Sequence, residues 1–309
     1  MTQSKKLDNP VLIVGSMAFD DLDLPSGSAK NVVGGSATYA SIAASLYSAV
    51  RIVGVVGEDF PEDTLSLLKN RDVDVTGVER VKGKTFRWAG KYSENLASRE
   101  TLDTQLNVFA DFRPKLPESY RDSKLVLLGN IHPALQLEVL AQTRAPKLVM
   151  ADTMNFWISG ERKALLDVLA KVDVLVVNDE EVRQLSGEHN LKRAAKAVLG
   201  MGPKQLVVKR GDAGAMLFDS SGTFFAPAYP LETEMDPTGA GDTFAGAILG
   251  FLARSEKLDR NAFRQAILAG ATAASFCVEG VGNSALVKLD HTALAARLKE
   301  LLALLDPSS

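Results

Sequence analysis

An acidic, glycine-rich run occurs late in the chain, with the sequence Asp236-Pro237-Thr238-Gly239-Ala240-Gly241-Asp242. Apolar residues follow it at helical spacing, at Phe244, Ile248 and Phe251, so a helix is predicted to begin within the run. The first amides of a helix have no partner inside the helix, and the positive end of its dipole attracts anions. Glycines let the backbone approach a phosphate closely. The run therefore predicts a phosphate site at a helix N-terminus.

Asp242 places a carboxylate beside this predicted phosphate site. A carboxylate there would repel phosphate unless it had a task, such as taking the proton of an attacking hydroxyl. Asp242 is therefore a candidate general base for phosphoryl transfer. The alternative is that it only supplies the polar residue commonly found at a helix N-terminus.

The elements that would position this site alternate regularly along the chain. Short β-rich runs occur at residues 11–14, 52–56, 125–128, 148–150, 174–177 and 206–208. Predicted helices between them include residues 36–46, 61–70, 161–170 and 180–186, and Pro61 suits a first helical position. This alternation predicts an α/β fold with a doubly wound, mostly parallel sheet that is flanked by helices.

Two segments break the alternation. Residues 20–33 are rich in turn formers, and residues 84–112 carry aromatic side chains without a helical period. We expect these segments to form a small β lid over the substrate cleft, inserted in a single domain of residues 1–309. Open strand edges need cover, so the lid also makes a homodimer plausible. Residues 260–305 are predicted to form two or three helices.

Composition excludes several classes of partner. The formal charge of −3 argues against nucleic acid or anionic lipid, because such binding needs clustered Lys and Arg. Cys277 is the only cysteine, so no internal disulfide forms and the chain suits a reducing compartment. No segment reaches the ~20 apolar residues of a membrane span, and no signal peptide is evident. A cytoplasmic location is the expectation.

The glycine-rich run resembles the C-terminal signature of the ribokinase/PfkB family of sugar and nucleoside kinases. Three further segments resemble family motifs in the same order along the chain. They are the double glycine within residues 33–40, the N-x-x-E motif at Asn178-Asp179-Glu180-Glu181, and the nucleotide segment Lys209-Arg210-Gly211-Asp212-Ala213-Gly214. The matches span roughly residues 11 to 290, so the resemblance covers nearly the whole chain. It implies a ribokinase-like fold and an ATP-dependent kinase.

The resemblance also assigns catalytic and nucleotide-binding roles. It implies that Asp242 deprotonates a primary hydroxyl, which attacks the γ-phosphate of ATP in line. The backbone amides of Gly239, Ala240 and Gly241 would stabilise the charge that grows on the transferred group. The implied nucleotide contacts are Asn178, Lys209, Gly211, Gly214 and Asn283.

Metal sites follow from the same resemblance. Mg²⁺ would enter with ATP and be held largely by phosphates and water, with Glu181 acting through water. Asn178 could instead serve only as the cap of the following helix. Asp236 and Thr238 match positions that bind a monovalent cation in potassium-activated members, although a turn explains an Asp before a Pro equally well.

Substrate binding is implied for Asp20, Gly34, Gly35 and Tyr39, and Asp20 matches the acidic residue that binds two substrate hydroxyls. Ala18 and Tyr39 stand where ribokinase-like members commonly have asparagines, which disfavours plain ribose. Aromatic lid residues could stack on a base, or could simply form local core. They are Phe86, Trp88 and Phe109.

These observations favour a kinase that phosphorylates the hydroxymethyl group of a sugar or ribonucleoside, with an adenosine-like nucleoside preferred. Alternatives are a kinase of a polyol or sugar phosphate, and a catalytically silent binding protein. A dinucleotide-dependent oxidoreductase is disfavoured, because Gly15-Ser16-Met17 after the first strand supplies no GxGxxG.

Overall fold

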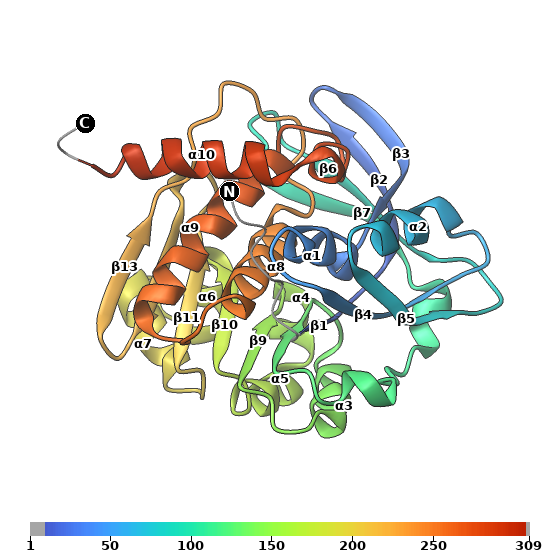
Figure 1. Ribbon diagram of the computed structural model, residues 1–309, viewed down its shortest axis with the longest axis horizontal. Coiled ribbons are helices and arrows are strands. Elements are labelled where there is room, and N and C mark those ends of the chain that lie inside the picture. The colour runs from blue at the N-terminus through green and yellow to red at the C-terminus, as the bar shows by residue number, and fades with distance from the viewer. Residues whose placement is uncertain (1–9, 307–309) are drawn as a thin grey trace.

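A nine-stranded sheet forms the centre of the computed structural model, which describes residues 10–306 (Figure 1). Its strand order is β13-β12-β11-β10-β9-β8-β1-β4-β5. The strands from β11 to β5 pair in parallel, whereas β12 and β13 pair antiparallel. The predicted doubly wound, mostly parallel sheet is therefore confirmed. Its strands are β1 (Val11–Val14), β4 (Val50–Val56), β5 (Val73–Arg80), β8 (Leu125–Leu128), β9 (Leu148–Asp152), β10 (Val174–Asn178), β11 (Gln205–Lys209), β12 (Ala215–Asp219) and β13 (Gly222–Ala226).

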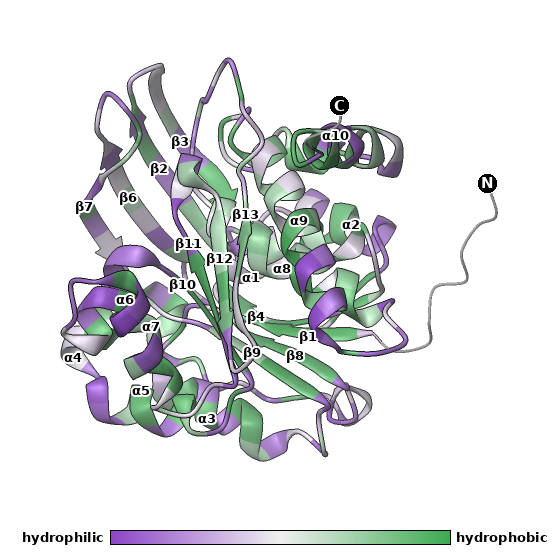
Figure 2. Cartoon of the chain, turned by 90° about the vertical axis from the view of Figure 1, so that its left-hand side faces the viewer, coloured by the Kyte–Doolittle hydropathy of each residue, from purple (hydrophilic) through white to green (hydrophobic). Residues whose placement is uncertain are grey.

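Helices cover both faces of this sheet (Figure 2). Strand β1 shows why, because Val11 and Ile13 join one hydrophobic cluster while Leu12 and Val14 join the other. The first cluster is covered by α1 (Ser36–Ser45), α2 (Glu62–Asn70), α8 (Ala240–Ala253), α9 (Arg260–Cys277) and α10 (His291–Ala303). The second lies under α3 (Pro133–Gln142), α4 (Asn155–Gly160), α5 (Arg162–Leu169), α6 (Asp179–Ser186) and α7 (Leu191–Leu199).

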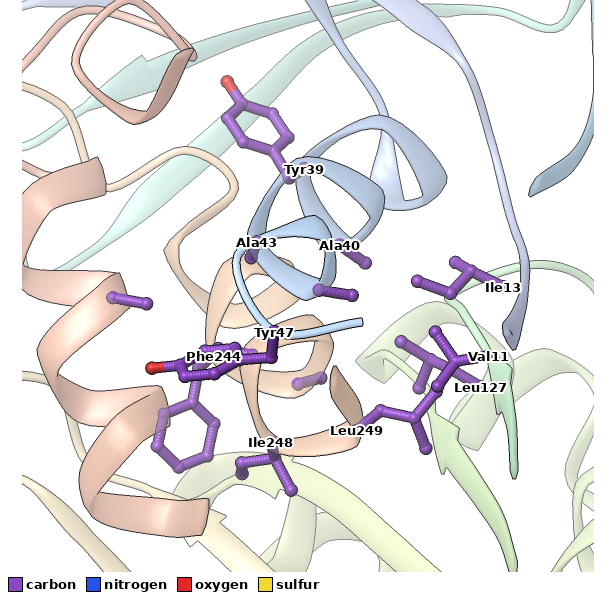
Figure 3. Packing of buried hydrophobic residues seen from close by; sticks show 14 of the residues in the cluster. Val11, Ile13, Tyr39, Ala40, Ala43, Tyr47, Leu127, Phe244, Ile248 and Leu249 are labelled. Atoms are coloured by element: carbon purple, nitrogen blue, oxygen red, sulfur yellow. The ribbon is translucent and has the colours of Figure 1, made fainter. Parts of the chain in front are cut away.

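Helices α1 and α8 pack backbone to backbone and so align their N-termini. A Cβ atom on Gly246 would lie 2.2 Å from the carbonyl oxygen of Ala40, and one on Gly250 would lie 2.6 Å from that of Ala44. In Figure 3, Ala40 and Ala43 of α1 and Phe244 and Ile248 of α8 are labelled among the residues of the apolar cluster. Each helix begins next to a glycine motif, so this packing brings the two motifs together.

Four strands form a second, small sheet in the order β3-β2-β6-β7 (Figure 1). They are β2 (Ala18–Leu24), β3 (Gly27–Gly34), β6 (Phe86–Tyr92) and β7 (Arg99–Gln105). The two segments that break the α/β alternation thus join in one sheet, as predicted. One face buries Leu22, Leu24 and Tyr92 in a cluster of their own. Every residue of β7 is exposed, so this edge strand is open.

One predicted boundary is wrong. Pro61 precedes α2 and does not occupy its first turn, because its ψ of 129° is extended and Glu62 is the first helical residue.

Among residues 10–306, no helix has both the length and the apolar character needed to cross a bilayer. Short 3₁₀ helices occupy η1 (Asn107–Asp111), η2 (Glu118–Tyr120), η3 (Gly211–Ala213) and η4 (Leu286–Lys288).

Candidate active site

The glycine-rich run forms a tight turn at the N-terminus of α8, as predicted. Gly239 caps the helix with φ of 76°, a conformation that favours glycine, and a Cβ atom there would lie 2.4 Å from the ring of Tyr39. The Ala240 amide donates to the Pro237 carbonyl at 3.1 Å, so it is engaged within the turn. No carbonyl among residues 10–306 accepts from the amides of Gly239, Gly241 and Asp242. These three amides are the donors available to an anion, so the prediction for the Ala240 amide is wrong, whereas the Gly239 and Gly241 amides stay candidates.

Asp242 lies in the first turn of α8, beside these amides. Burial and the neighbouring charge of Asp152 raise the pKa of its carboxyl to about 7, while Lys209 and Arg99 oppose that shift. A carboxyl with this pKa accepts and releases a proton at neutral pH. The geometry is therefore suited to general-base chemistry at the turn of residues 236–242, which we call the anion turn.

Asn178 and Glu181 form a reciprocal cap at the start of α6. The Asn178 side-chain oxygen accepts from the Glu181 amide at 2.8 Å, and a Glu181 carboxylate oxygen accepts from the Asn178 amide at 2.8 Å. The capping role considered for Asn178 is thus present. Burial raises the pKa of Glu181 to about 7, although Lys209 lowers it. Among the described residues, no group of three or more His, Cys, Asp or Glu side chains is placed to hold a metal ion.

The predicted nucleotide segment links β11 to β12. Gly211 and Gly214 both have positive φ, and the Arg210 amide donates to the Gly214 carbonyl at 2.8 Å. Residues 211–213 are exposed, so their backbone is accessible to a ligand. Asn283 lies elsewhere, with its side-chain amide donating to the Val33 carbonyl at 2.9 Å. That contact places it beside the double-glycine segment, and its role toward nucleotide stays a prediction.

Asp20 is a buried carboxylate on lid strand β2, with 5 % of its surface exposed. Burial and the charges of Asp236 and Asp242 raise its pKa to about 8. A Cβ atom on Gly34 would lie 1.9 Å from an Asp20 carboxylate oxygen, so only glycine leaves room for this side chain. Gly35 has φ of 93° and turns the chain into α1. The double glycine thus packs against Asp20, and Asp20 faces the site with Asp242.

The Tyr39 ring packs against the anion turn at Gly239. Tyr39 is 1 % exposed, and its hydroxyl has no hydrogen-bond partner among the described residues. Figure 3 shows its hydroxyl end pointing away from the apolar cluster. A direct contact between Tyr39 and substrate stays a prediction.

The predicted cation residues join the turn to the loop after α9. The Asp236 carboxylate is fully buried and accepts from the amides of Thr238 at 2.8 Å and Gly282 at 2.7 Å. The Thr238 hydroxyl lies 2.9 Å from the hydroxyl of Tyr92 on β6. The lid is therefore hydrogen-bonded directly to the anion turn, as expected of a cover over the cleft. Tyr92 was not predicted to lie at the site.

The lid aromatics separate into two groups. Phe86 and Phe109 have ring centroids 5.4 Å apart, and Phe109 stacks on Phe112 at 5.5 Å, so these side chains form a local core. Trp88 pairs in register with Asp20, which places both side chains on the same face of the lid. Arg99 lies 5.7 Å from the Trp88 ring, and its positive charge reaches both Asp20 and Asp242. Arg99 was not singled out from the sequence.

The shifted carboxyls predict a steep pH dependence. Asp242 must be ionised to accept a proton, and Asp20 must be ionised to accept hydrogen bonds from two hydroxyls. We therefore expect log(kcat/KM) to rise with pH, with a slope near two below a pKa of about 7 for Asp242, and to level off above a pKa of about 8 for Asp20. A kcat/KM that is constant between these limits contradicts the assignment.

The same shifts fix the sign of the stability change, as part of that prediction. Both pKa values are raised above the ordinary aspartate value of 3.8, so the folded chain binds more protons than the unfolded chain between that value and about 8. The free energy of unfolding should therefore fall as pH rises through this window. Melting temperatures measured across the window check this direction, and Asp242→Asn should weaken the dependence.

The chain matches one family model over most of its length. The model for pfkB family carbohydrate kinases matches residues 9–288. A cytidine kinase from Thermococcus kodakarensis is 29% identical over 254 residues, which is 81% of this chain and 90% of the relative. An aminoimidazole riboside kinase from Salmonella typhimurium is 33% identical over 98 residues, or 32% of this chain and 30% of the relative.

Solved structures share the fold. An E. coli protein described as a ribokinase II, in complex with ATP and Mg²⁺, superposes with a TM-score of 0.78 at 20% identity over 94% of this chain and 99% of its own. Aminoimidazole riboside kinase from Salmonella enterica, with aminoimidazole riboside and an ATP analogue, gives 0.75 at 20% identity over 94% and 100%. The ribokinase-like fold predicted from the motifs is confirmed.

Proposed function

The chain belongs to the pfkB family of carbohydrate kinases, and we propose that this ATP-dependent phosphotransferase acts on the hydroxymethyl group of a ribonucleoside. In this proposal Asp242 takes the proton of the hydroxymethyl oxygen as that oxygen attacks the γ-phosphorus of ATP. The bond from this phosphorus to the bridging oxygen breaks, and ADP leaves. The amides at the start of α8 stabilise the charge on the transferred group. The Asp242 proton then leaves to solvent after the phosphoester has formed.

The observation that carries the nucleoside proposal is the pairing of Asp20 with Trp88 on one face of the lid. A buried carboxylate accepts hydrogen bonds from two neighbouring hydroxyls and so orients a vicinal diol. An indole on the same face offers an aromatic surface for a base, worth ~1–3 kcal/mol for a stacked base. Free ribose would satisfy the carboxylate but carries no base to stack on the indole. The cytidine kinase relative supports the same substrate class.

A substrate panel tests this proposal. We expect a ribonucleoside to show a kcat/KM about tenfold to a hundredfold higher than free ribose, since that is the preference that base stacking supplies. Coupled assays of ADP release would compare adenosine, cytidine and other ribonucleosides with ribose, fructose, inositols and sugar phosphates. Faster turnover of ribose, fructose or a sugar phosphate than of every nucleoside would refute the nucleoside class and leave the kinase assignment intact. The adenosine-like preference is decided within the same panel.

A second candidate substrate class has one specific observation in its favour. Arg99 reaches over the site from β7, and a guanidinium there would pair with a phosphate or carboxylate on the substrate. A kinase of a sugar phosphate would use this contact. The panel separates the two classes, because an anionic substrate should lose most of its kcat/KM in Arg99→Gln and a neutral nucleoside should lose less.

The site residues also suggest where Mg²⁺ and K⁺ would bind. Mg²⁺ bound with ATP would offset phosphate charge, with the free carboxylate oxygen of Glu181 holding its water. A K⁺ ion near Asp236 and Thr238 would need further oxygen ligands such as backbone carbonyls, because each Asp236 oxygen already uses one of its two lone pairs for a backbone amide. A homodimer through the open edges of the lid remains a prediction.

A further inference from the structure

We propose that Asp152 is a positioning residue that holds Lys209 against the anion turn, where Lys209 binds the phosphoryl group in transfer. This inference rests on the proposed kinase function. Asp152 is a buried carboxylate that takes no part in the reaction proposed above. Asp152 ends β9 and Lys209 ends β11, with β10 paired between these two strands.

Three contacts fix the backbone and side chain of Asp152. Its residue is 6 % exposed, and one carboxylate oxygen accepts from the Thr153 amide at 2.8 Å. The other carboxylate oxygen lies 3.4 Å from the Lys209 ammonium. The Asp152 carbonyl accepts from the Gln136 side chain at 3.0 Å. Asp152 therefore presents one oxygen to Lys209 from a rigid strand end.

The ammonium of Lys209 lies at the anion turn itself. Its nitrogen is 2.8 Å from the position that a Cβ atom on Gly241 would occupy. The Gly241 amide is one of the donors available to an anion. An anion bound by that amide would therefore also lie within reach of the ammonium. A Lys ammonium is a compact point charge on a flexible stem, and pairing with a fixed carboxylate restricts its position.

The surrounding carboxylates keep Lys209 in its cationic form, which is the form that can bind a phosphate. Three carboxylates, those of Asp152, Glu181 and Asp242, act on the single ammonium of Lys209, and together they raise its pKa against the effect of burial. Lys209 is therefore held as a cation at neutral pH. Its charge also acts on the general base Asp242, and its nitrogen lies against Gly241 of the anion turn.

The alternative is that Asp152 only offsets the burial of a structural lysine. A double-mutant cycle with Asp152→Asn and Lys209→Met separates the two roles, with kcat and the KM for ATP measured for each variant. We expect Lys209→Met to lower kcat by about 10²–10³-fold, the scale of one lost transition-state donor. Asp152→Asn should lower kcat by about tenfold or more, with a smaller change in KM. In the Lys209→Met background, Asp152→Asn should have little further effect.

A matched control lies one residue before the same strand. Lys204 precedes β11 and pairs with Asp173 at 2.7 Å, and its side chain is 80% exposed. Lys204→Met should leave kcat and KM unchanged. Asp152→Glu keeps the charge and should recover part of the activity that Asp152→Asn loses.

The inference is overturned if both single variants keep kcat within about twofold, or if their effects on kcat multiply in the double variant. If Asp152→Asn does not fold, Lys209→Met decides alone. The inference is then overturned if Lys209→Met keeps the wild-type kcat and the wild-type ³¹P shift of the bound γ-phosphate. Wild-type protein that fails to phosphorylate any alcohol would instead remove the proposed function, and with it the basis of this inference.

Discussion

Replacing Asp242 by asparagine is expected to lower kcat by about 10²–10⁴-fold, which is the contribution of a positioned general base. Asparagine keeps the shape of the side chain but cannot accept the proton of the attacking hydroxyl. ATP should still bind, because the amides of the anion turn and the nucleotide segment are unchanged. Isothermal titration with ATP and steady-state kinetics measure the two properties separately.

Asp259→Asn is the matched control for this substitution. Asp259 caps the neighbouring helix α9 by accepting from the Ala262 amide at 2.9 Å, and asparagine serves equally well as a cap. Its kcat should stay at the wild-type value. Asp242→Asn should melt at least as high as wild type near pH 8, because it removes a buried negative charge. Retained kcat in a folded Asp242→Asn protein rules out the general-base role.

Asp20→Ala should reduce kcat/KM for every substrate by about 10²–10⁴-fold. Two hydrogen bonds from substrate hydroxyls to a carboxylate, at ~1.5–3 kcal/mol each, would account for this range. The loss should appear mainly in KM if the carboxylate binds substrate and transition state alike. A deoxy analogue of the best substrate sharpens the test. Removing one hydroxyl should lower kcat/KM strongly in wild type and only slightly in Asp20→Ala.

The adjacent residue provides the control for Asp20. Asp21 lies on the same strand but faces the other way, where its carboxylate accepts from the Asn31 amide at 2.7 Å and pairs with Arg87. Asp21→Ala should leave kcat/KM within about twofold of wild type. Equal losses in both variants, or the same deoxy penalty in Asp20→Ala as in wild type, would show that Asp20 does not bind the substrate diol.

The sequence predicted the elements whose pattern is strong and local. Runs buried on both faces, such as β1 and β10, are continuously apolar, and the helix after the glycine run has a clear apolar face. Strand β5 (Val73–Arg80) was not predicted, because charged residues and Gly77 interrupt its apolar run at the edge of the sheet. Lid strand β7 carries no apolar period at all, since all of its residues are exposed. Hydrogen bonds to β6, and not side-chain pattern, define it as a strand.

The candidate site was predictable where chemistry is concentrated in a short motif. Asp242, Asp20 and the double glycine meet because α1 and α8 begin side by side, and the resemblance of their motifs to the family had assigned all of them to one site. Asp152, Tyr92 and Arg99 reach the site only through strand pairing and the placement of the lid. A usable signal existed for Asp152, since a polar residue at the carboxyl end of a buried parallel strand lies at the ligand edge of such sheets. No local signal marks Tyr92 or Arg99.

The central claim is that a γ-phosphoryl group moves to a hydroxymethyl oxygen, and ³¹P NMR of the reaction tests it most directly. Wild-type protein would be incubated with ATP, Mg²⁺ and the best nucleoside of the panel. The predicted result is a new phosphomonoester signal, split by two methylene protons, that grows in step with ADP and is absent with Asp242→Asn. Formation of ADP with only free inorganic phosphate, or no ADP with any alcohol offered, would contradict the account.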